Sequence, residues 1–449
     1  MPVALIALVA FIATIVTWNV VVKRNMAEAM ILGFLVTLAF AGFNAPEYAV
    51  TAVVEASENQ VLYAAVAFVF MTHFVERTGV IDRLIAILSS LFGKLPGGPA
   101  IVDTLASGAM GAVAGGSNTG NAASSGSITG PWMVRTGWKR SRAATVIAGN
   151  AGLGTALPPS ASMVIMIGFA GTLVTTSEVY LALLVAGIYQ FVFRMGLIGW
   201  FVKRDKITAA SGPELLPWRT AMKRGGSSTL IFLGAIIPIA ISVGPLADVL
   251  KASPVLSEAM GSISLIVWIP VLIMFFAALV AWKDLPRSPR GWWELITSGA
   301  PKFYTIVALL FFAVVASEVL AELGLAEDVD NLLSGVDIPL WLLVTFIGLL
   351  IVLVAGPLSS TATLTAVGQV SLFTLIAAGI DPLLAVIAIL VFASTEGASP
   401  PASGAIFVAS GLTGAKPEST FVPLIIYYVV PFFALGVLIA LGIVPVPGG

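Results

Sequence analysis

Long apolar runs recur along the whole sequence, and they constrain the fold more than any other feature. Only 10% of the 449 residues are charged, whereas soluble domains carry about 25%. A soluble fold made from these runs would have almost no polar surface, so a soluble enzyme is excluded. The sequence instead predicts an all-α polytopic membrane protein in a lipid bilayer. Uninterrupted spans are expected at 2–22, 27–43, 61–73, 179–202, 227–246, 263–282, 303–319 and 421–444.

Residue types that carry much of protein chemistry are rare or absent. The chain has no Cys and a single His, His73, which excludes disulfides, thiolate metal sites, a His-based zinc site and a Ser-His-Asp triad. The formal net charge of −1 offers no electrostatic footprint for nucleic acid. His73 is expected at an interfacial span end.

The basic residues sort to one side of the predicted membrane topology. The first span is followed by Lys23 and Arg24 and shows no signal-peptide cleavage site, so its N-terminus is expected outside. All of the 22 Lys and Arg residues except Lys251 and Arg194 then fall on one side. The positive-inside rule makes this side cytoplasmic and both termini periplasmic. Arg194 is expected either to snorkel toward the cytoplasmic surface or to have a function.

Two apolar stretches are interrupted by Gly, Ser, Thr, Asn and Pro, and they resemble each other. The first contains SNTGN from Ser117 and then Pro158-Pro159, and the second contains SSTAT from Ser359 and then Pro400-Pro401, an offset of 242 residues for both motifs. The flanking three-span units start on opposite sides, which predicts inverted repeats. Inverted repeats with discontinuous helices are typical of secondary transporters. The alternative is chance recurrence of small-residue motifs.

Each repeat is expected to have the same order of elements: three spans, an interfacial arm, a re-entrant hairpin, a broken span and a final span. The first repeat comprises 1–202, with its arm at 79–93, hairpin at 97–135 and broken span at 139–174. A cytoplasmic linker follows at 203–225. The second repeat comprises 226–449, with its arm at 321–336, hairpin at 338–377 and broken span at 382–412.

The breaks suggest a cation site. Ala143–Leu173 would be about 46 Å long as one helix, against about 30 Å for the hydrocarbon core. Pro159 lacks an N–H and leaves the carbonyl four residues earlier without its helical donor. Such carbonyls, together with hydroxyl and amide oxygens, are ligands for hard cations, and the absence of a carboxylate from the first cluster favours a monovalent one. Half-helix N-termini after each tip would favour an anionic substrate group.

Some of these polar residues have a second interpretation. Small residues in membrane helices often allow close packing, which is expected for Gly108–Gly115. Asn118 and Asn121 favour a site role, because an amide in hydrocarbon needs partners. Glu396, an acid inside the second broken span, is a functional candidate. Its alternative is a protonated or locally paired structural acid, and for Asp103 both interpretations stay open.

Three segments resemble a known family. Val75–Asn118, which contains LPGG, and Gly149–Ile165, which contains PPS, look like the large membrane subunit of tripartite ATP-independent periplasmic (TRAP) transporters. Ser399–Ala415 resembles the second Pro-Pro segment of that family and the following helix. The resemblance covers essentially the whole chain. The short SNT motif also resembles the signature of sodium-coupled dicarboxylate transporters in the same broad superfamily.

The resemblance implies an elevator-type transporter of the bacterial inner membrane. A transport domain of hairpins and broken spans would move against a scaffold of the other spans, coupled to Na⁺. A periplasmic substrate-binding protein would deliver a small organic acid, and a small four-span membrane subunit would extend the scaffold.

Motif matching also implies site residues. One Na⁺ site falls on Ser117, Asn118, Gly152 and Thr155, and the other on Ser360, Thr361, Ser394 and Gly397. Substrate contacts would come from Thr119, Asn121, Ser160 and Thr363, with Glu396 added to them. Glu396 and Asn118 depart from the family pattern. An acid at position 396 could add a proton-coupled step or suit a substrate that carries a positive group.

Two other functions compete with this one. The first is a stand-alone Na⁺/organic-anion carrier that needs no binding protein. The second is a channel or a non-transporting membrane scaffold, although a channel should show a polar stripe along several spans, whereas the polar residues here cluster at two tips. A membrane enzyme is not expected, because Glu396 has no obvious acid/base partner. Neighbouring reading frames that encode a binding protein and a four-span protein would favour the TRAP system.

Overall fold

The regular elements of the computed structural model are helical throughout the part of the chain it describes. The described residues are 2–58, 60–113, 118–208, 216–242, 245–253, 265–325, 327–328, 331 and 339–449. Four helices among them are long and apolar enough to cross a bilayer, or up to six if each bent pair is one span. The expectation of an all-α, multi-pass architecture is confirmed at this level.

The first half of the chain contains the first predicted hairpin and broken span. Its helices are α1 (Val3–Val16), a π-helical turn (Thr17–Val21), α2 (Met26–Ala39), α3 (Ala45–Glu58), α4 (Gln60–Arg77), α5 (Val80–Phe92), α6 (Gly98–Val113), α7 (Asn118–Arg135), α8 (Arg140–Ala151), α9 (Leu153–Ala156), α10 (Ala161–Ala170) and α11 (Thr176–Arg204). The segments Arg140–Ala156 and Ala161–Leu173 meet at 42°, so the broken span is bent where Pro158-Pro159 lies.

The second half is also built from helices. Its helices are α12 (Trp218–Gly225), α13 (Leu233–Ser242), α14 (Pro245–Lys251), α16 (Leu265–Val280), α17 (Pro289–Glu322), α19 (Leu340–Ala355), α20 (Ser360–Thr363), α21 (Gln369–Ala377), α22 (Pro382–Ala393), α23 (Gly404–Thr413), α24 (Glu418–Leu424) and α25 (Val430–Ala440). Half of the predicted arm at 321–336 lies outside the described residues, as does Ser117. The repeat boundaries and the re-entrant path of the hairpins stay predictions.

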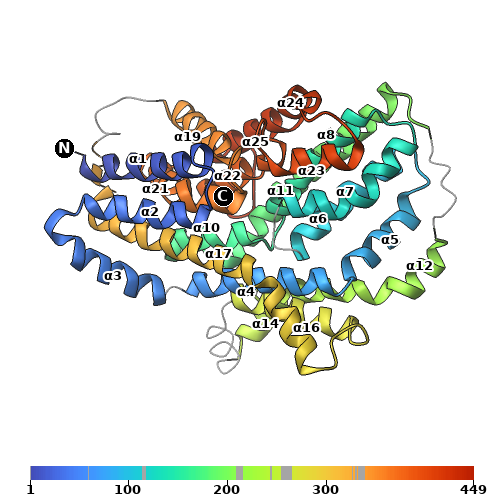
Figure 1. Ribbon diagram of the computed structural model, residues 1–449, viewed down its shortest axis with the longest axis horizontal. Helices are drawn as coiled ribbons and strands as arrows, with labels where there is room; N and C mark the ends of the chain where they lie inside the picture. Colours follow the sequence, from blue (N-terminus) through green and yellow to red (C-terminus); the bar gives the residue numbers. More distant parts are fainter. Residues whose placement is uncertain are drawn as a thin grey trace.

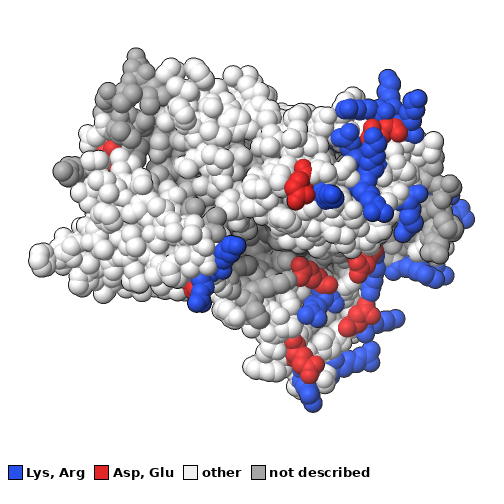
Figure 2. Space-filling model, turned by 45° about the horizontal axis from the view of Figure 1, so that its top comes forward, with Lys and Arg blue, Asp and Glu red and all other residues white. Residues whose placement is uncertain are grey.

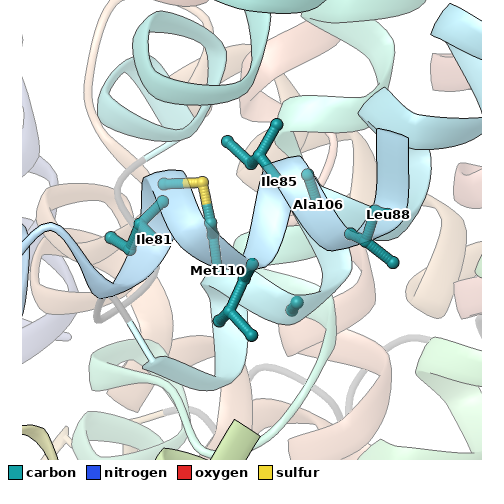
Figure 3. A pocket seen from close by; sticks show the side chains of 7 residues that line it. Ile81, Ile85, Leu88, Ala106 and Met110 are labelled. Atoms are coloured by element: carbon teal, nitrogen blue, oxygen red, sulfur yellow. The ribbon is translucent and has the colours of Figure 1, made fainter. Parts of the chain in front are cut away.

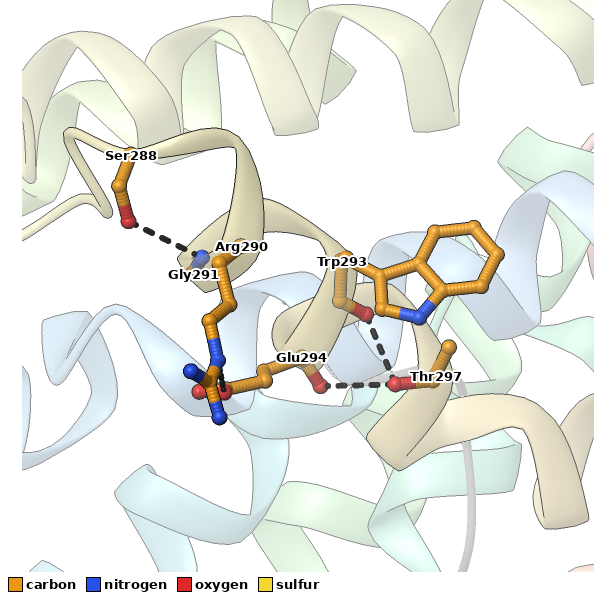
Figure 4. A network of polar contacts seen from close by, with 6 residues as sticks. All are labelled: Ser288, Arg290, Gly291, Trp293, Glu294 and Thr297. Atoms are coloured by element: carbon orange, nitrogen blue, oxygen red, sulfur yellow. Dashed lines mark hydrogen bonds and ion pairs between the residues drawn. The ribbon is translucent and has the colours of Figure 1, made fainter.

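Two helices differ from the predicted elements. Helix α3 was not predicted, because it carries Glu47, Glu55 and Glu58 and buries little beyond Ala52 and Ala56. The span expected at 303–319 is part of a much longer helix, α17. Figure 4 shows the start of α17, where the Ser288 hydroxyl accepts from the Gly291 N–H at 3.1 Å.

That first turn of α17 is also stabilised on its exposed face. Arg290 pairs with Glu294 one turn later, with 3.1 Å between Nε and Oε1. The Thr297 hydroxyl donates to the Trp293 carbonyl. The residues of this turn are polar, so the apolar pattern begins only after it. Hydropathy alone therefore placed the start of the helix too late.

The helices form two groups that meet around α10, α11 and α22 (Figure 1). One group contains α1, α2, α3 and α17, which pack side by side. The other contains α6, α7, α8 and α23, in which α23 packs against both α7 and α8. Segments from both broken stretches therefore share one core, which positions the candidate site.

The predicted amphipathic arm is α5. It begins after Gly79, whose φ of +64° is in the left-handed region, and it packs against α6 through apolar side chains (Figure 3). The gap that Ile81, Ile85 and Met110 help to line has a volume of only about 10 Å³. Such a gap is apolar and about the size of one water molecule, so it is not a substrate site.

The charged surface is uneven. Figure 2 shows that Lys and Arg side chains on the face drawn gather at the right-hand end, while most of the remaining surface is uncharged. Large apolar side chains such as Phe43, Phe346 and Trp293 are exposed. An apolar surface with basic residues at one end is typical of a chain that spans a bilayer.

Candidate functional site

The first break lies between α8 and α10, and backbone and side-chain donors satisfy its carbonyls. The Gly152 carbonyl accepts from the N–H groups of Thr155 and Ala156. The Ala151 carbonyl accepts from Asn121 Nδ2 at 3.0 Å. The peptide bond Pro158-Pro159 is cis. The carbonyl of Thr155, which the sequence predicted to lose its helical donor, lies 3.4 Å from the Ser160 hydroxyl.

The second break lies between α22 and α23 and is lined mainly by hydroxyl groups. The Ser394 hydroxyl donates to the Val391 carbonyl at 2.7 Å, and the Thr395 hydroxyl donates to the Phe392 carbonyl at 2.7 Å. The peptide bond Pro400-Pro401 is also cis. Glu396 begins the 3₁₀ turn Glu396–Ala398 in this break and is buried.

The two breaks touch each other, and glycine makes this contact possible. A Cβ atom on Gly152 would lie 2.1 Å from the Ser394 carbonyl oxygen. A Cβ atom on Gly397 would lie 3.0 Å from the Ala148 carbonyl oxygen. Since real Cβ atoms do not approach backbone this closely at Gly152, only glycine fits there without a shift. The backbones of the two broken stretches therefore meet in the core.

Four predicted site residues form one hydrogen-bonded cluster across this contact. Asn118, the first residue of α7, donates from Nδ2 to the Ser360 hydroxyl at 3.0 Å. The Thr155 hydroxyl lies 3.0 Å from Asn118 Oδ1 and 3.3 Å from Ser360 Oγ. Ser360 Oγ in turn lies 3.2 Å from Glu396 Oε2. Residues assigned by sequence to two separate ion sites thus meet in one place, which we call the oxygen cluster.

Acceptor oxygens in the oxygen cluster outnumber the hydroxyl protons that face them. The single Ser360 hydroxyl proton faces both Glu396 Oε2 and the Ala393 carbonyl, at 3.2 and 3.1 Å. The single Ser403 hydroxyl proton faces Glu396 Oε1 and the Gly397 carbonyl, at 3.4 and 3.3 Å. Glu396 belongs to none of the three ion pairs among the described residues. The Asn118 side chain and the Ser360 backbone N–H also donate to Glu396. A small cation would add to these contacts through the remaining oxygen lone pairs.

The type of cation follows from the ligands. No group of three or more His, Cys, Asp or Glu residues that could hold a metal ion occurs in the described part of the chain. The oxygen cluster has one carboxylate, with hydroxyl, amide and carbonyl oxygens around it. Sites for Ca²⁺ use several carboxylates, so this cluster fits a monovalent cation better.

The other predicted residues lie around the oxygen cluster in different roles. Ser160 accepts from the Met163 N–H and begins α10. Thr119 is exposed and packs against Gly404, and the half-buried Thr361 lies 3.1 Å from Ser359 Oγ. Their side chains do not enter the hydrogen-bonded cluster, so their assigned roles stay predictions.

Two predicted substrate residues carry buried oxygen atoms that have no hydrogen-bond partner among the described residues. They are Asn121 Oδ1 and Thr363 Oγ1. Asn121 uses its nitrogen to bind the Ser107 and Ala151 carbonyls. A buried polar atom without a partner is costly. These two atoms are therefore free to take a ligand group.

Asp103 forms a separate polar network inside the first hairpin. The Thr129 hydroxyl donates to Oδ1 at 2.8 Å, and Asn150 Nδ2 donates to Oδ2 at 2.9 Å. The same Asn150 nitrogen also lies 2.9 Å from Thr104 Oγ1. Asp103 is fully buried. Asp103 lies on α6 and its partners come from α7 and α8, so it joins the hairpin to the broken span.

Of the two interpretations that the sequence left open for Arg194, snorkelling does not occur. The residue is 1% exposed and its guanidinium points into the core. Its Nε and Nη2 atoms donate to the Gly149 carbonyl at 3.2 and 3.1 Å. Gln190 lies one helical turn before it, and an i, i+4 polar pair in an apolar span was the available signal. Ser403, which contacts Glu396, had no such signal.

Known proteins that resemble this chain in sequence are components of one transporter family. Residues 5–445 match the family described as "Tripartite ATP-independent periplasmic transporter, DctM component". The C4-dicarboxylate TRAP transporter large permease protein DctM of Pseudomonas aeruginosa is 22% identical over 369 residues, which are 82% of this chain and 81% of that protein. The protein of the same name from Rhodobacter capsulatus is 23% identical, covering 77% of each chain.

Two further matches have lower sequence identity. The isethionate TRAP transporter permease protein DctMQ of Oleidesulfovibrio alaskensis is 20% identical over 89% of this chain, which spans 59% of that longer protein. The crystal structure of the YdaH transporter of Alcanivorax borkumensis superposes with a TM-score of 0.66 at 16% identity, covering 89% of both chains. At this identity the YdaH match shows the fold alone.

Proposed function

The chain belongs to the DctM family, the large permease component of TRAP transporters, and from this premise we propose that it imports a small organic anion together with Na⁺. Membership in the family makes the chain a multi-pass secondary transporter subunit and not an enzyme. The TRAP resemblance of the sequence is thereby confirmed. Coupling, mechanism and substrate are our proposals.

The oxygen cluster carries the proposal of Na⁺ coupling. It joins Asn118 and Thr155 of the first broken stretch to Ser360 and Glu396 of the second. Its ligand atoms are hard oxygens with a single carboxylate, a set that suits Na⁺. In transporters with discontinuous helices, unwound backbone at the midplane commonly coordinates the coupling ion. An ion bound by both stretches would contact each of them. Its binding would therefore depend on how the two stretches move relative to each other.

The substrate groups lie next to this cluster. Helices α7 and α20 begin at Asn118 and Ser360, so their N–H groups face the same region, and helix N-termini attract anions. Among the described residues, Asn121 Oδ1 and Thr363 Oγ1 have no hydrogen-bond partner, so they are available to polar groups of the substrate. The relatives are named for C4-dicarboxylate and isethionate, both small organic anions. We therefore propose a substrate of this class.

The assembly and movement follow the family. TRAP large permeases work with a periplasmic binding protein and a small membrane subunit, and we propose both as partners. We also propose an elevator movement of the hairpins and broken spans, in the bacterial inner membrane with both termini periplasmic. The chain lacks native Cys, so a Cys placed at Ser141 reports sidedness cleanly. Labelling of that Cys by an impermeant reagent from the periplasmic side would contradict this orientation.

The decisive experiment is uptake by proteoliposomes that contain the chain with its small subunit and binding protein. Radiolabelled succinate and isethionate serve as probes, with pH held constant. We expect uptake that requires Na⁺ and the binding protein. Equal rates in Na⁺ and K⁺ would contradict Na⁺ coupling. Na⁺-dependent uptake without the binding protein would instead support the stand-alone carrier.

A further inference from the structure

Two arginines meet aromatic rings where the long apolar helix α11 ends. The Arg204 guanidinium carbon lies 4.8 Å from the centre of the Trp200 ring, and Nη1 donates to the Tyr427 hydroxyl at 3.3 Å. The Arg142 guanidinium carbon lies 4.2 Å from the centre of the Phe201 ring. The Tyr427 ring packs on the other two, with ring centres 5.5 Å from Trp200 and 5.4 Å from Phe201. These three rings, which we call the aromatic cluster, hold both guanidinium groups.

The charges of the two arginines are compensated differently. Arg142 Nε lies 3.3 Å from Asp205 Oδ2, and both side chains are largely buried. Arg204 is exposed, and it belongs to none of the three ion pairs found in the described part of the chain. A guanidinium held against a ring presents a planar fork of N–H groups, which suits bidentate binding of phosphate. Arg204 is therefore oriented by the aromatic cluster while its charge remains available to a ligand.

The neighbouring side chains indicate that Arg204 lies at the membrane surface. Helix α11 is long and apolar enough to cross a bilayer, and Lys203 and Arg204 form the basic end of its last turn. Trp200 is exposed one turn earlier, and Trp and Tyr side chains are enriched at the headgroup level of membranes. Ile426, which precedes Tyr427 in the chain, is an exposed apolar residue. The exposed surface therefore changes from apolar to basic within a few residues, as the surface of a phospholipid does.

The local charge distinguishes between the kinds of headgroup. Lys203, Arg204 and Lys206 are exposed in the last turn of α11 or directly after it. Asp205 lies between them in the chain, but its carboxylate is paired with Arg142. A zwitterionic headgroup would bring an ammonium group, for which the paired Asp205 is a poor partner. An anionic headgroup brings a negative charge without an ammonium group, and the three exposed cations complement it.

We infer that this end of α11 binds the headgroup of an anionic phospholipid such as phosphatidylglycerol. The lipid phosphate accepts from the remaining N–H groups of Arg204, and Lys203 adds a second positive charge. The acyl chains stay in the bilayer, beside the apolar surface of the helix. The aromatic cluster keeps the Arg204 guanidinium at the level of the phosphate. This inference is independent of the proposed Na⁺ coupling and of the transported substrate.

The test is native mass spectrometry of the purified full-length chain, titrated in detergent with phosphatidylglycerol or with phosphatidylethanolamine of identical acyl chains. The variants are Arg204→Gln, Arg204→Lys and the control Arg135→Gln. Arg135 is an exposed arginine in the last turn of α7, and it lies over no aromatic ring of the described residues. Its replacement therefore removes the same charge without disturbing the aromatic cluster.

We expect wild type to bind phosphatidylglycerol more tightly than phosphatidylethanolamine. Arg204→Gln should weaken phosphatidylglycerol binding about tenfold, because a charge-assisted hydrogen bond to the phosphate is lost. Arg135→Gln should leave the affinity unchanged. Arg204→Lys keeps the charge but loses the planar fork, so its affinity should be intermediate. Glycerophosphoglycerol, which is the headgroup without acyl chains, should not displace the lipid at millimolar concentration.

Three outcomes would overturn the inference. Equal effects of Arg204→Gln and Arg135→Gln, whether large or absent, would mean that positive charge acts here without a defined site. Equal binding of the two lipids to wild type would contradict the preference for an anionic headgroup. Displacement by glycerophosphoglycerol would indicate a site for a soluble anion. The comparison of lipids on wild type remains a test even if a variant does not fold, and none of these outcomes bears on Na⁺-dependent uptake.

Discussion

Asp103 and Glu396 are both buried acids, and their surroundings differ in a way that separates structure from function. Asp103 has a hydrogen-bond donor for each oxygen, at 2.8 and 2.9 Å, from Thr129 and Asn150 on neighbouring helices. Glu396 lies in a helix break, where the Ser360 and Ser403 hydroxyls are 3.2 and 3.4 Å away and each has a competing acceptor. The Asn118 side chain, which also donates to Ser360, and the Ser360 backbone N–H are its other partners.

This difference teaches where a buried acid can act. A carboxylate with its own donors joins the helices around it and needs nothing more. A carboxylate that shares its donors with other acceptors is compensated less fully, and an ion can add to that compensation. We therefore expect substitutions at Asp103 to change stability and substitutions at Glu396 to change Na⁺ binding. The following predictions, from the largest effect to the smallest, test that separation.

The largest effect is expected for Gly152→Ala. The new Cβ would lie 2.1 Å from the Ser394 carbonyl oxygen, which is backbone and cannot turn away. Separating the two breaks should lower the free energy of unfolding by about 3 kcal/mol and abolish Na⁺ binding. The measurements are the thermal unfolding midpoint and a Na⁺ titration. Gly199→Ala in α11, where a Cβ meets nothing within 4 Å, is the matched control. Normal Na⁺ affinity in Gly152→Ala would show that the oxygen cluster does not need this contact.

Asp103→Ala should reduce stability without changing Na⁺ affinity. The substitution removes the acceptor of Thr129 and Asn150, and it leaves a small cavity. The loss should be about 2 kcal/mol, because both donors retain a second acceptor nearby. Asp103→Asn keeps the shape and should cost less. Thermal unfolding and the Na⁺ titration are measured on the same samples. A Na⁺ affinity that falls together with stability would contradict the proposed difference, in which Asp103 affects stability and Glu396 affects Na⁺ binding.

Glu396→Gln should show the reverse pattern. The amide keeps the shape of the side chain but removes the charge that offsets a bound cation. The apparent Na⁺ affinity should fall about tenfold, which corresponds to roughly 1.4 kcal/mol, while the unfolding midpoint without Na⁺ stays close to that of wild type. Asp103→Asn is the control, since it makes the same chemical change in the other acid. Superimposable Na⁺ titrations for wild type and Glu396→Gln would return Glu396 to a structural role.

The sequence predicted the main elements because apolar runs and helix breakers mark them. The hairpin at 97–135 contains α6 and α7, and the arm at 79–93 contains α5. By contrast, α3 could not be predicted, because its acidic residues lower the hydropathy of the segment. The helix packs on α17, and Ala52 and Ala56 are buried. Hydropathy reports lipid contact and not helix packing.

The sequence predicted the members of the site better than their arrangement. Motif matching selected Asn118, Thr155 and Ser360, which the structure brings into contact. It assigned them to two ion sites, because spacing along the chain gives no distance between the two stretches. The contact between Arg194 and the Gly149 carbonyl could not be predicted, because backbone acceptors are not visible in a sequence.

The smallest effects are expected within the oxygen cluster, where neutral side chains can be removed one at a time. Asn118→Ala removes a contact to Ser360 in the buried centre and should weaken Na⁺ binding by about 1 kcal/mol, or roughly fivefold. Thr361→Ala should weaken it less, because the half-buried Thr361 hydroxyl contacts only the exposed Ser359 hydroxyl among the described contacts. A double-mutant cycle of Asn118→Ala with Ser360→Ala should be non-additive, since the two side chains are in contact, whereas Thr361→Ala with Asn118→Ala should be nearly additive. The Na⁺ titration provides all of these values. Additivity in the first cycle would mean that Asn118 and Ser360 bind separate ions, so the two stretches would hold two sites and not the single one that Glu396 completes.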